Sequence, residues 1–420
     1  MRRIVIFAAG SQGDIQPCLV LGKALQEAGF SIRLAAPENF ASLARAHDVP
    51  LHPLRGDVRQ IMAGPTGSRF MESGGGQLLQ SIRAMRAMLG PIARQMADDA
   101  LEAAREAEAL ISLAVFATLA QTIAEARKIP LILVEPTPLL PTRAYPAPGW
   151  PIQANLGGLH NRASGAAMLR VIWEWYRPFV NDLRRRLRLR PLAGADFHLI
   201  LASTPLLGAY SPAVIPRPAD APPTAHVTGY WFQDTPPGWR PPDGLEAFLQ
   251  AGPPPVYVGF GSMGGQDPAA LAGLIHEALA QAGQRGLLLT GWGGLPAGSK
   301  SSRVFTIDSA PHSWLFPRMA AVVHHGGAGT TAEGLRAGRP SVVVPFILDQ
   351  PFWGRRVRAL GAGPEPIPRR RLTAARLAAA IRAAVTDPRL SQAAADLGRA
   401  IRAEDGPGRA VQLVRQYLGA

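Results

Sequence analysis

The sequence predicts an α/β protein with two Rossmann-like domains, each a doubly wound parallel sheet, that face a central cleft. Short apolar runs bounded by turn residues alternate with segments of helical spacing, which is typical of βαβ units. The alternation occurs twice, and a proline-dense tract separates the two halves. A chain of 420 residues, 47% of them hydrophobic, is long and apolar enough to fill two such cores.

The first half, residues 1–230, is expected to form one domain. Its strand candidates are RIVIFAA, SIRLAAP, ALISLAV, LILVEPT and FHLILAS, and helical patterns such as IQPCLVLGKALQEAG and TLAQTIAEARK lie among them. The tract PPGWRPPDGLEAFLQAGPPP cannot sustain a helix or a central strand, because proline lacks an amide donor. We therefore place a linker at residues 231–254.

The pattern restarts in residues 255–420, where we expect the second domain. PVYVGFGS, GLLLTGW, VFTIDSA, AAVVHHGG and PSVVVPF are its strand candidates, with AALAGLIHEALAQAG and TTAEGLRAG as helices. The last helix of the chain is expected to pack back on the first domain. Parallel sheets bind ligands at the carboxyl ends of their strands, so the cleft between the domains is the expected site.

Composition narrows the setting. Cys18 is the only cysteine, no secretory leader follows Met1, and no run reaches about 18 apolar residues, so we expect a cytoplasmic protein without a membrane span. The net charge of +14 comes almost entirely from arginine, which indicates a compositional bias of the genome. The alternative is contact with an anionic membrane surface through arginines at 184–190 or 369–371. No nucleic-acid module accompanies these clusters.

A glycine loop, GSQGD, follows the first strand candidate and opens a helix. It lacks the third glycine of the dinucleotide fingerprint and ends in Asp14, where a phosphate would be repelled. Asp14 therefore has two interpretations, a helix cap that accepts amide hydrogen bonds or a base that faces the cleft.

The segment VVHHGGAGTTAEGLRAGRPSVVVPFILDQPFW, residues 322–353, is the richest motif. A strand ends at a histidine pair, glycines then let backbone approach a ligand, and Thr330 and Thr331 open a helix. Amides at such a helix mouth favour a diphosphate, and the His325 ring is placed to donate to a phosphate oxygen. The lysine-bearing loop GxxxxGK[ST] is absent, so hydrolysis of a nucleoside triphosphate has no support.

These motifs resemble those of the two-domain GT-B glycosyltransferases of the family 1 type, close to sterol glucosyltransferases of bacteria and fungi and to antibiotic-tailoring glycosyltransferases. The resemblance covers nearly the whole chain. It implies transfer of a hexose, glucose in the first instance, from a UDP-sugar to a hydroxyl of a lipophilic acceptor such as a sterol, polyphenol, macrolide or lipid. GSQGD resembles the family's GSRGD, whose acid deprotonates the acceptor, so Asp14 is implied as the general base.

The resemblance also implies the donor site. The equivalent of His325 binds the diphosphate in the family, the pair Asp349 and Gln350 holds the sugar hydroxyls, and Glu333 matches a glutamate that grips the ribose of UDP. The donor-site candidates are Ser262, His312, His325, Gly327, Gly329, Thr330, Glu333, Asp349 and Gln350, with Ser11, Gly13, Trp292 and Trp353 as a second group. Ser309 stands where plant members stack a tryptophan on uracil.

Two features of the reaction follow from chemistry. A single in-line displacement inverts the anomeric carbon. Because no DxD-like acidic pair accompanies the phosphate motif, we expect the helix mouth and His325 to replace a divalent metal, with no further cofactor.

Acceptor contacts are the least determined part of the site. Apolar and aromatic side chains gather in the first half, and their alternative role is to fill its core. The candidates are Met85, Met88, Trp150, Trp173 and Tyr176. For His324, next to His325, we favour a packing role.

Two other functions share this sequence pattern. A sugar-nucleotide epimerase of the same fold would keep the donor site and need no apolar acceptor cleft. A non-catalytic partner subunit of a glycosyltransferase would carry an eroded site, against which the intact Asp14, His325, Asp349 and Gln350 argue.

Overall fold

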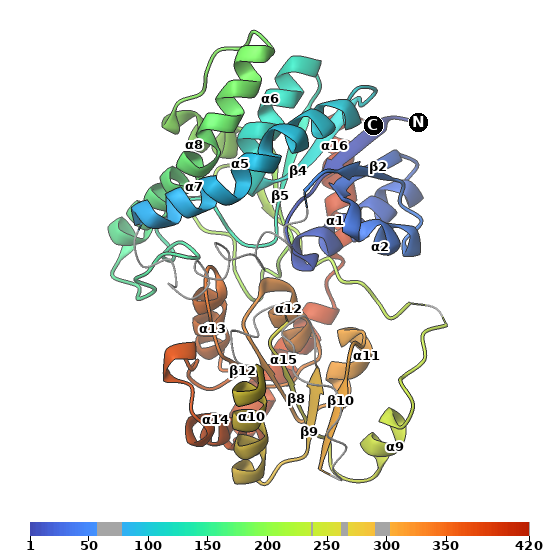
Figure 1. The fold of residues 1–420 in the computed structure, drawn as a ribbon, viewed down its shortest axis with the longest axis vertical. Helices are drawn as coiled ribbons and strands as arrows, with labels where there is room; N and C mark the ends of the chain where they lie inside the picture. The colour runs from blue at the N-terminus through green and yellow to red at the C-terminus, as the bar shows by residue number, and fades with distance from the viewer. Residues whose placement is uncertain (57–77, 237, 262–267, 290–302, 420) are drawn as a thin grey trace. The chain divides into compact units, whose positions relative to one another are not determined.

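The computed structural model of the chain describes residues 1–56, 78–236, 238–261, 268–289 and 303–419. The chain divides into two units, Met1–Trp231 with Asp405–Ala420, and Phe232–Glu404. Each unit contains one sheet whose strands all run parallel (Figure 1). The predicted fold class, two parallel-sheet α/β domains, is confirmed.

The first unit contains a seven-stranded sheet in the order β3-β2-β1-β4-β5-β6-β7. Its strands are β1 Arg3–Phe7, β2 Ser31–Pro37, β3 Leu51–Leu54, β4 Ala109–Leu113, β5 Leu131–Glu135, β6 Leu206–Gly208 and β7 Ala225–Val227. The strand order reverses direction between β1 and β4. Such a reversal opens a crevice at the carboxyl ends of the two strands, where ligands of doubly wound sheets bind.

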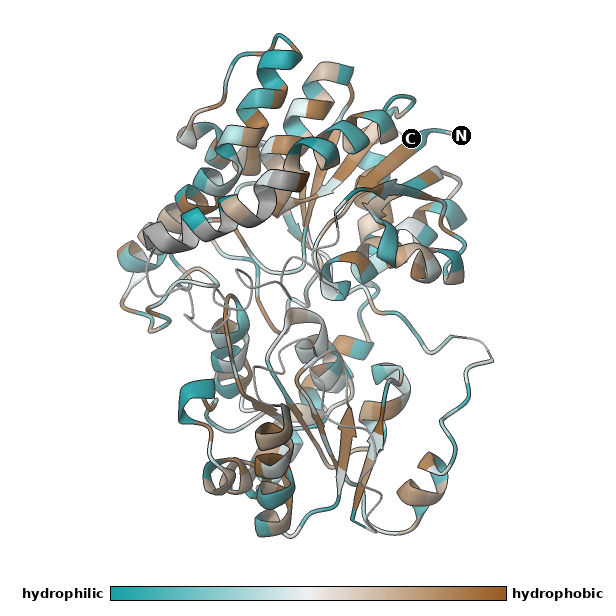
Figure 2. Ribbon diagram, in the orientation of Figure 1, coloured by the Kyte–Doolittle hydropathy of each residue, from teal (hydrophilic) through white to brown (hydrophobic). Residues whose placement is uncertain are grey.

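Helices cover both faces of this sheet, so its strands are buried apolar runs, which colour brown in Figure 2. One face packs against α1 Gln12–Glu27 and α16 Gly406–Leu418, and the other against α5, α6, α7 and α8. The helices of this unit are α1, α2 Ala41–Ala46, α5 Leu78–Ala103, α6 Ala117–Arg127, α7 Gly158–Arg186, α8 Gly194–Ser203 and α16.

The second unit repeats the plan with five strands in the order β10-β9-β8-β11-β12. Its strands are β8 Val256–Gly259, β9 Gly286–Leu289, β10 Val304–Ile307, β11 Ala321–His324 and β12 Ser341–Val343. The reversal here lies between β8 and β11. The helices are α9 Leu245–Gln250, α10 Pro268–Ala282, α11 His312–Leu315, α12 Ala328–Arg336, α13 Gln350–Ala359, α14 Ala374–Thr386 and α15 Pro388–Arg402.

One predicted strand is wrong. FHLILAS lies in helix α8, which buries Phe197, Ile200 and Leu201 on one face, a helical spacing within a short apolar run. Asp196 at the third position of this helix accepts a hydrogen bond from the backbone N–H of Ala193 and fixes its start. The edge strand β3 was not predicted, and it contains Pro53, which an edge strand tolerates.

Two connecting segments fold onto the units. Helix α16 packs on α1 through Ala410, Val411 and Val414, so the end of the chain belongs to the first unit. The start of the predicted linker lies on the second unit, where Asp234, just before the proline-dense tract, pairs with Arg336 at 2.6 Å. None of the helices in the described ranges is both long enough and apolar enough to cross a lipid bilayer.

Candidate functional site

The residues of interest follow strands that flank the reversal in each sheet. In the first unit, Asp14 lies in the first turn of α1, directly after β1. In the second unit, His325 follows β11, and Gly261 follows the neighbouring strand β8. Each set therefore occupies the position where a doubly wound sheet binds its ligand.

Asp14 closes the start of α1. Its Oδ2 accepts hydrogen bonds from the backbone N–H of Ser11 at 2.7 Å and from the Ser11 hydroxyl at 2.9 Å. Gly10 has φ +135°, and a Cβ there would lie 2.4 Å from Oδ2, so the carboxylate needs a glycine at this position. The geometry gives Asp14 the capping role that was one of its two interpretations, and the half-buried carboxylate stays beside the carboxyl end of β1.

A chain of aromatic rings runs from β1 to α7. Burial and the Asp14 charge together raise the pKa of Tyr176, so the phenol from α7 lies within electrostatic reach of Asp14. Tyr176 meets Phe116 edge to face at 5.7 Å, and Phe116 meets Phe7 of β1 at 5.3 Å. Asp14 and Tyr176, two predicted residues, thus interact electrostatically. The sequence analysis did not single out Phe116. It could have been found from its position directly after β4, a strand that flanks the reversal of the sheet.

A second acid at the same edge of the first sheet was also missed. Glu135 ends β5 and is 3% exposed. Its Oε1 accepts a hydrogen bond from the Tyr210 hydroxyl at 2.8 Å and its Oε2 from the Leu139 N–H at 2.9 Å. Burial outweighs these two bonds and raises the pKa of Glu135 to about 7.

In the second unit, the turn from β11 into α12 depends on two glycines. Gly326 has φ +89°, and a Cβ there would lie 2.7 Å from the Val343 side chain. A Cβ on Gly327 would lie 2.5 Å from Nε2 of His325. Gly327 caps α12 without a side-chain hydrogen bond, and the first intrahelical bond of this turn runs from Thr331 N–H to the Gly327 carbonyl. The N–H groups of Gly329 and Thr330 in the first turn therefore face outward, as an anion site requires.

The His325 ring is held as a neutral imidazole. Burial lowers its pKa to about 4, so near pH 7 it carries no charge and presents one N–H donor. Its Nδ1 is buried and has no hydrogen-bond partner among the residues that the structure describes. An imidazole in this state binds a phosphate oxygen through a hydrogen bond rather than through charge.

The other two histidines of the motif pack. His324 is buried at the end of β11, and its Nδ1 accepts a hydrogen bond from the Gly326 N–H at 3.1 Å, in agreement with the packing role. His312, a donor-site candidate, stacks on Phe316 at 4.3 Å with 15° between the planes. Burial lowers the pKa of His324 to about 3 and that of His312 to about 4, with repulsion from a protonated His325 ring as a further cause.

The candidates for the sugar begin helix α13. Oε1 of Gln350 accepts hydrogen bonds from the N–H groups of Phe346 at 2.8 Å and Ile347 at 3.1 Å, which leaves its Nε2 as the side-chain donor for a ligand. Trp353 is 0% exposed, and its Nε1 donates to Oδ2 of Asp349 at 2.9 Å. This burial corrects the expectation that Trp353 contacts the donor. Leu348 has φ +54°, a strained conformation for leucine, directly before Asp349.

Glu333 lies one and a half turns into α12 and is largely buried, with its side chain 12% exposed. Burial raises the pKa of Glu333 to about 7; Arg336, 4.0 Å away, lowers it, and Asp234 raises it further. The guanidinium of Arg336 also lies over the Phe232 ring at 4.5 Å. Asp234 and Phe232 come from the predicted linker, directly before the proline-dense tract, and their part in this environment was not predicted.

The remaining candidates divide by burial. Trp173 is 1% exposed in the core between the first sheet and α7, which corrects its assignment to the acceptor. Trp150 is half-buried, and Ser11 and Gly13 are exposed at the start of α1. Met85 and Met88 lie in α5, but their side chains fall outside the described part of the chain, as do the residues Ser262 and Trp292.

A hollow of about 430 Å³ in the first unit lies elsewhere. Leu131, Pro205 and Tyr417 line it, at the amino ends of β5 and β6 and beside α16. It is therefore at the opposite edge of the sheet from Asp14, and we do not assign it to this site. Within the described ranges, no cluster of three or more His, Cys, Asp or Glu side chains has the arrangement of a metal centre.

Two known protein families match separate parts of the chain. Residues 4–146 match the glycosyltransferase family 28 N-terminal domain. Residues 297–416 match the erythromycin biosynthesis protein CIII-like C-terminal domain. The first match contains Asp14, and the second contains His325, Glu333, Asp349 and Gln350.

Individual relatives match over almost the whole chain. A sterol 3-beta-glucosyltransferase of Arabidopsis thaliana is 35% identical over 99% of this chain and 68% of its own length. The O-mycaminosyltylonolide 6-deoxyallosyltransferase of Streptomyces fradiae is 35% identical over 99% of this chain and 97% of its own length. Among solved structures, the glycosyltransferase of kitacinnamycin has a TM-score of 0.72 at 21% identity, covering 99% of both chains, which shows a shared fold.

Proposed function

The chain belongs to the GT-B glycosyltransferases that include the sterol 3-beta-glucosyltransferases and the antibiotic glycosyltransferases, and from that premise we propose its donor, acceptor and mechanism. It transfers a hexose, glucose in the first instance, from a UDP-sugar to a hydroxyl of a lipophilic small molecule. Asp14 is the general base, and the product has the inverted anomeric configuration.

The observation that carries the proposal is that the groups suited to each half of this chemistry follow the strands at the reversal of each sheet. The first unit offers a half-buried carboxylate, Asp14, whose charge acts on the Tyr176 phenol. The second offers a helix mouth with a neutral histidine, α12 with His325. Glycosyl transfer needs both, a base for the acceptor and a stabilised leaving group for the donor.

The leaving group is a nucleoside diphosphate. The bond from the anomeric carbon to the diphosphate oxygen breaks, and its electron pair stays on that oxygen. The N–H groups of Gly329 and Thr330 and the positive end of α12 favour this negative charge. His325 contributes a hydrogen bond from a neutral ring, so the bond does not depend on pH near neutrality. We expect these donors to act without a divalent metal.

The attacking group is the acceptor hydroxyl. Its oxygen forms the new bond to the anomeric carbon from the side opposite the diphosphate, and its proton passes to a carboxylate oxygen of Asp14. The Ser11 donors hold Oδ2 and so fix the orientation of the carboxylate that takes the proton. Attack from the opposite face gives a β-glycoside from an α-linked donor.

Two features support the choice of substrates. Glu333 on α12 is a buried acceptor that suits the ribose hydroxyls of UDP, whereas a deoxyribose offers it one hydroxyl fewer. Phe116, Tyr176 and the half-buried Trp150 offer apolar surface in the unit that holds Asp14, which favours a lipophilic acceptor. The Arabidopsis relative is named for a sterol and the Streptomyces relative for a macrolide, and both are hydroxylated lipophilic acceptors.

The test is a transfer assay with the purified chain. UDP-glucose and dTDP-glucose are each offered with a sterol, a flavonoid, a macrolide and a free sugar, in the presence of EDTA, and products are read by mass spectrometry and by the anomeric coupling in the NMR spectrum. We expect a β-glucoside of a lipophilic acceptor, formed faster from UDP-glucose.

Other outcomes separate the alternatives. Release of an epimerised sugar without any acceptor would establish an epimerase. Transfer only to the free sugar would contradict the lipophilic acceptor, and transfer that stops in EDTA and returns with magnesium would contradict the metal-independent mechanism. No turnover with any pair, together with intact UDP binding, would favour a non-catalytic partner subunit.

A further inference from the structure

The described part of the chain exposes few large hydrophobic side chains, and half of them gather in one short segment. Six such residues are strongly exposed, and three fall within eight positions: Ile152 at 51%, Leu156 at 62% and Leu159 at 80%. They lie in the loop between β5 and α7 and in the first turn of α7, at the left edge of Figure 1. We call these three side chains the apolar tip. Clustered exposed aliphatic groups on an ordered segment mark a contact surface.

The backbone beneath the apolar tip is held in place. Nε2 of Gln153 donates to the carbonyl oxygens of Ala147 at 2.8 Å and Trp150 at 2.6 Å. Oδ1 of Asn155 accepts from Nδ2 of Asn161 at 2.8 Å and from the Gly157 N–H at 3.1 Å. These bonds tie the loop to itself and to α7, so the aliphatic side chains are presented outward by a fixed scaffold.

The surroundings of the apolar tip are basic. From Pro136 to Trp173 the sequence contains Arg143, Arg162 and Arg170 and no acidic residue. A Cβ on Gly158 would lie 3.1 Å from Nε of Arg143, so this guanidinium lies against the start of α7 beside the tip. Arg162 is exposed three residues after Leu159.

The nearest carboxylates only partly offset this charge. Asp220 accepts hydrogen bonds from the Thr142 hydroxyl at 2.6 Å and the Arg143 N–H at 2.9 Å, and the Arg162 charge contributes to lowering its pKa. Glu174 pairs with Arg170 at 3.1 Å. Arg143 and Arg162 thus bring two guanidinium groups to the border of the apolar tip, and the described carboxylate near them, Asp220, is already engaged by Thr142 and by the backbone of Arg143.

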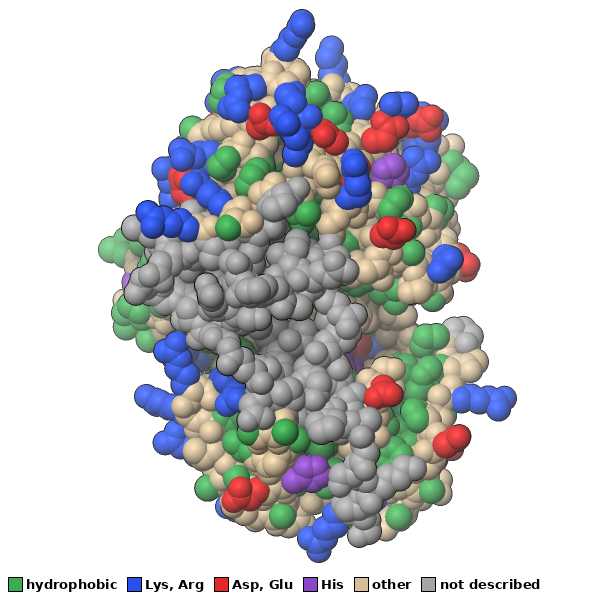
Figure 3. Space-filling view, viewed as in Figure 1, with side chains coloured by type: hydrophobic (Ala, Val, Ile, Leu, Met, Phe, Trp, Pro, Cys, Tyr) green, Lys and Arg blue, Asp and Glu red, His purple; other side chains and the backbone are tan. Residues whose placement is uncertain are grey.

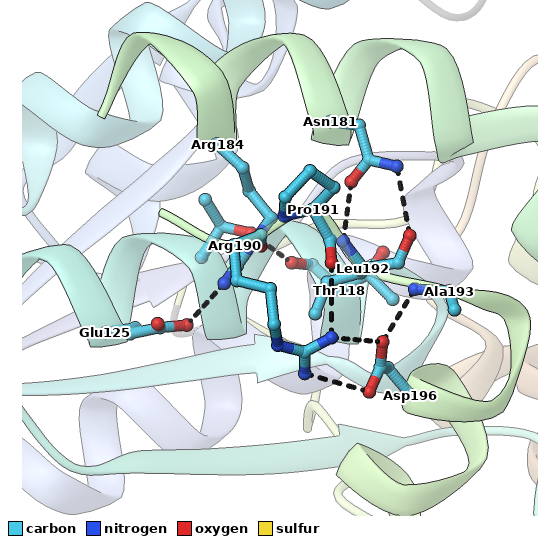
Figure 4. A network of polar contacts seen from close by, with 10 residues as sticks. Thr118, Glu125, Asn181, Arg184, Arg190, Pro191, Leu192, Ala193 and Asp196 are labelled. Atoms are coloured by element: carbon cyan, nitrogen blue, oxygen red, sulfur yellow. Dashed lines mark hydrogen bonds and ion pairs between the residues drawn. The ribbon is translucent and has the colours of Figure 1, made fainter. Parts of the chain in front are cut away.

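The arginine-rich end of α7 is different, because its charges are paired within the protein. Arg184 is buried and donates to Glu125 at 2.8 Å, and Arg190 pairs with Asp196 at 3.1 Å (Figure 4). Arg186 pairs with Asp98 at 2.7 Å. Figure 3 likewise shows Lys and Arg beside Asp and Glu over the visible face of this unit. The 184–190 cluster is therefore a poor membrane contact, which corrects one of the two clusters considered from the sequence.

We propose that the apolar tip, with Arg143 and Arg162, docks the first unit on an anionic phospholipid surface. The three aliphatic side chains enter the boundary between headgroups and acyl chains, and the two guanidinium groups bind lipid phosphates. Such docking brings a lipophilic acceptor and the unit that holds Asp14 to the same surface. The inference does not depend on the proposed transfer reaction, because binding is measured without donor or acceptor.

The experiment measures sedimentation of the full chain with vesicles of phosphatidylcholine alone and of an equimolar mixture of phosphatidylcholine and phosphatidylglycerol. We expect binding to the anionic vesicles, weakened by high salt. The double variant Leu156→Ser/Leu159→Ser should reduce the partition coefficient at least about tenfold. The double variant Arg143→Gln/Arg162→Gln should reduce it roughly fivefold for each arginine, on anionic vesicles only.

Leu199→Ser is the matched control, because Leu199 is 59% exposed in the same unit but lies on α8, outside the apolar tip. It should bind vesicles like the parent chain. All variants are at exposed positions, and thermal melting confirms that each is folded. The Leu156/Leu159 and Arg143/Arg162 double variants should turn over a water-soluble phenol at the rate of the parent chain. This assay separates vesicle binding from the transfer reaction.

Three results would overturn the proposal. The first is no vesicle binding by the parent chain, or equal binding to neutral and anionic vesicles. The second is that the triple variant Arg369→Gln/Arg370→Gln/Arg371→Gln loses vesicle binding while the Leu156/Leu159 and Arg143/Arg162 double variants keep it. This result would assign docking to the other arginine cluster. The third is a parent dimer that becomes a monomer in Leu156→Ser/Leu159→Ser, which would make the tip an interface between two copies of the chain.

Discussion

The indole Nε1 of Trp353 donates a hydrogen bond of 2.9 Å to Oδ2 of Asp349, four residues earlier in the chain. Trp353 is fully buried, so the bond is made from the protein interior toward the carboxylate that begins α13. The bond fixes the orientation of a carboxylate that is a candidate contact for the donor sugar. We therefore expect Trp353 to be a positioning residue that acts on the donor sugar through Asp349.

Trp353→Phe should therefore affect the sugar more than the nucleotide. The substitution keeps a large ring and removes the N–H donor, and loss of a hydrogen bond to a charged group costs about 1.5–3 kcal/mol. We expect kcat/KM for UDP-glucose to fall roughly tenfold or more while the Kd of UDP is unchanged. Kinetics and calorimetry measure the two quantities. Equal losses for UDP and UDP-glucose would indicate a purely structural role for the ring.

Asp14→Asn tests the general base. The amide keeps an oxygen that can accept from Ser11, but it cannot take a proton, so turnover should fall roughly 10²-fold to 10⁴-fold with UDP affinity intact. The chain offers a matched control in Asp196, which holds the Ala193 N–H at 2.6 Å at the same position of α8. Asp196→Asn should lower the melting temperature without lowering turnover. A similar, purely thermal effect of both variants would leave Asp14 as a helix cap.

Glu333 should make UDP binding depend on pH. Its pKa is raised to about 7 by burial, and a carboxylate that accepts from ribose hydroxyls binds them best when ionised. The affinity for UDP should therefore rise as the pH increases through 7, and UDP should bind about 1.5–3 kcal/mol better than 2′-deoxy-UDP.

The control is Glu333→Gln, measured by calorimetry between pH 6 and 8 with both nucleotides. The phosphate of UDP also titrates in this range, but it does so equally in the variant. The difference between the two proteins therefore isolates the carboxyl group. Parallel pH profiles, or equal affinities for UDP and its 2′-deoxy analogue in the parent, would remove Glu333 from the ribose site.

Trp150→Ala should weaken the acceptor alone. The backbone of Trp150 is fixed by its N–H bond to Ala147 at 3.0 Å and by Gln153, so the half-buried ring can be removed without releasing the loop. We expect the KM of a lipophilic acceptor to rise roughly tenfold, the upper range for a lost aromatic contact, with the Kd of UDP unchanged. An unchanged acceptor KM would place the ring outside the acceptor contacts.

Glu135 should make the protein less stable as the pH rises toward neutrality. Its pKa is about 7 in the folded state against 4.5 for the free side chain, so the folded state binds more protons between these values. This difference in proton binding at Glu135 should therefore lower the free energy of unfolding by roughly 3 kcal/mol as the pH rises through that window, and should have no effect on it at lower pH. Glu135→Gln should flatten the slope of melting temperature against pH from 5 to 7. An unchanged slope would show that another group is responsible.

Much of the fold was readable in local patterns, with one instructive failure. The runs at β1, β2 and β11 alternate with helical spacing and are bounded by glycine, so their type and approximate limits follow from periodicity. FHLILAS failed because a short, largely apolar run fits either structure. The decision came from the capping carboxylate of Asp196 and from the packing of Phe197 and Leu201 on the sheet.

The candidate site divides in the same way. The glycines at 326 and 327 and the acid at 14 are visible in the sequence because a turn with positive φ or a close backbone approach requires particular residue types. The pairing of Trp353 with Asp349, the burial of Trp173 and the role of Phe116 were not visible. They depend on which neighbours surround a side chain, and spacing along the chain does not specify neighbours across a sheet.

The sequence by itself therefore determined the two parallel sheets, the glycosyltransferase family and the residue types at each strand end, because these depend on local periodicity and short motifs. The tertiary structure alone decided how each group is used. Burial makes His325 a neutral donor and raises the pKa values of Glu333 and Glu135. Distant carboxylates neutralise most of the arginines at the end of α7, while an ordered loop leaves Leu156 and Leu159 exposed. Desolvation and charge pairing are properties of surroundings, and surroundings exist only once the chain has folded.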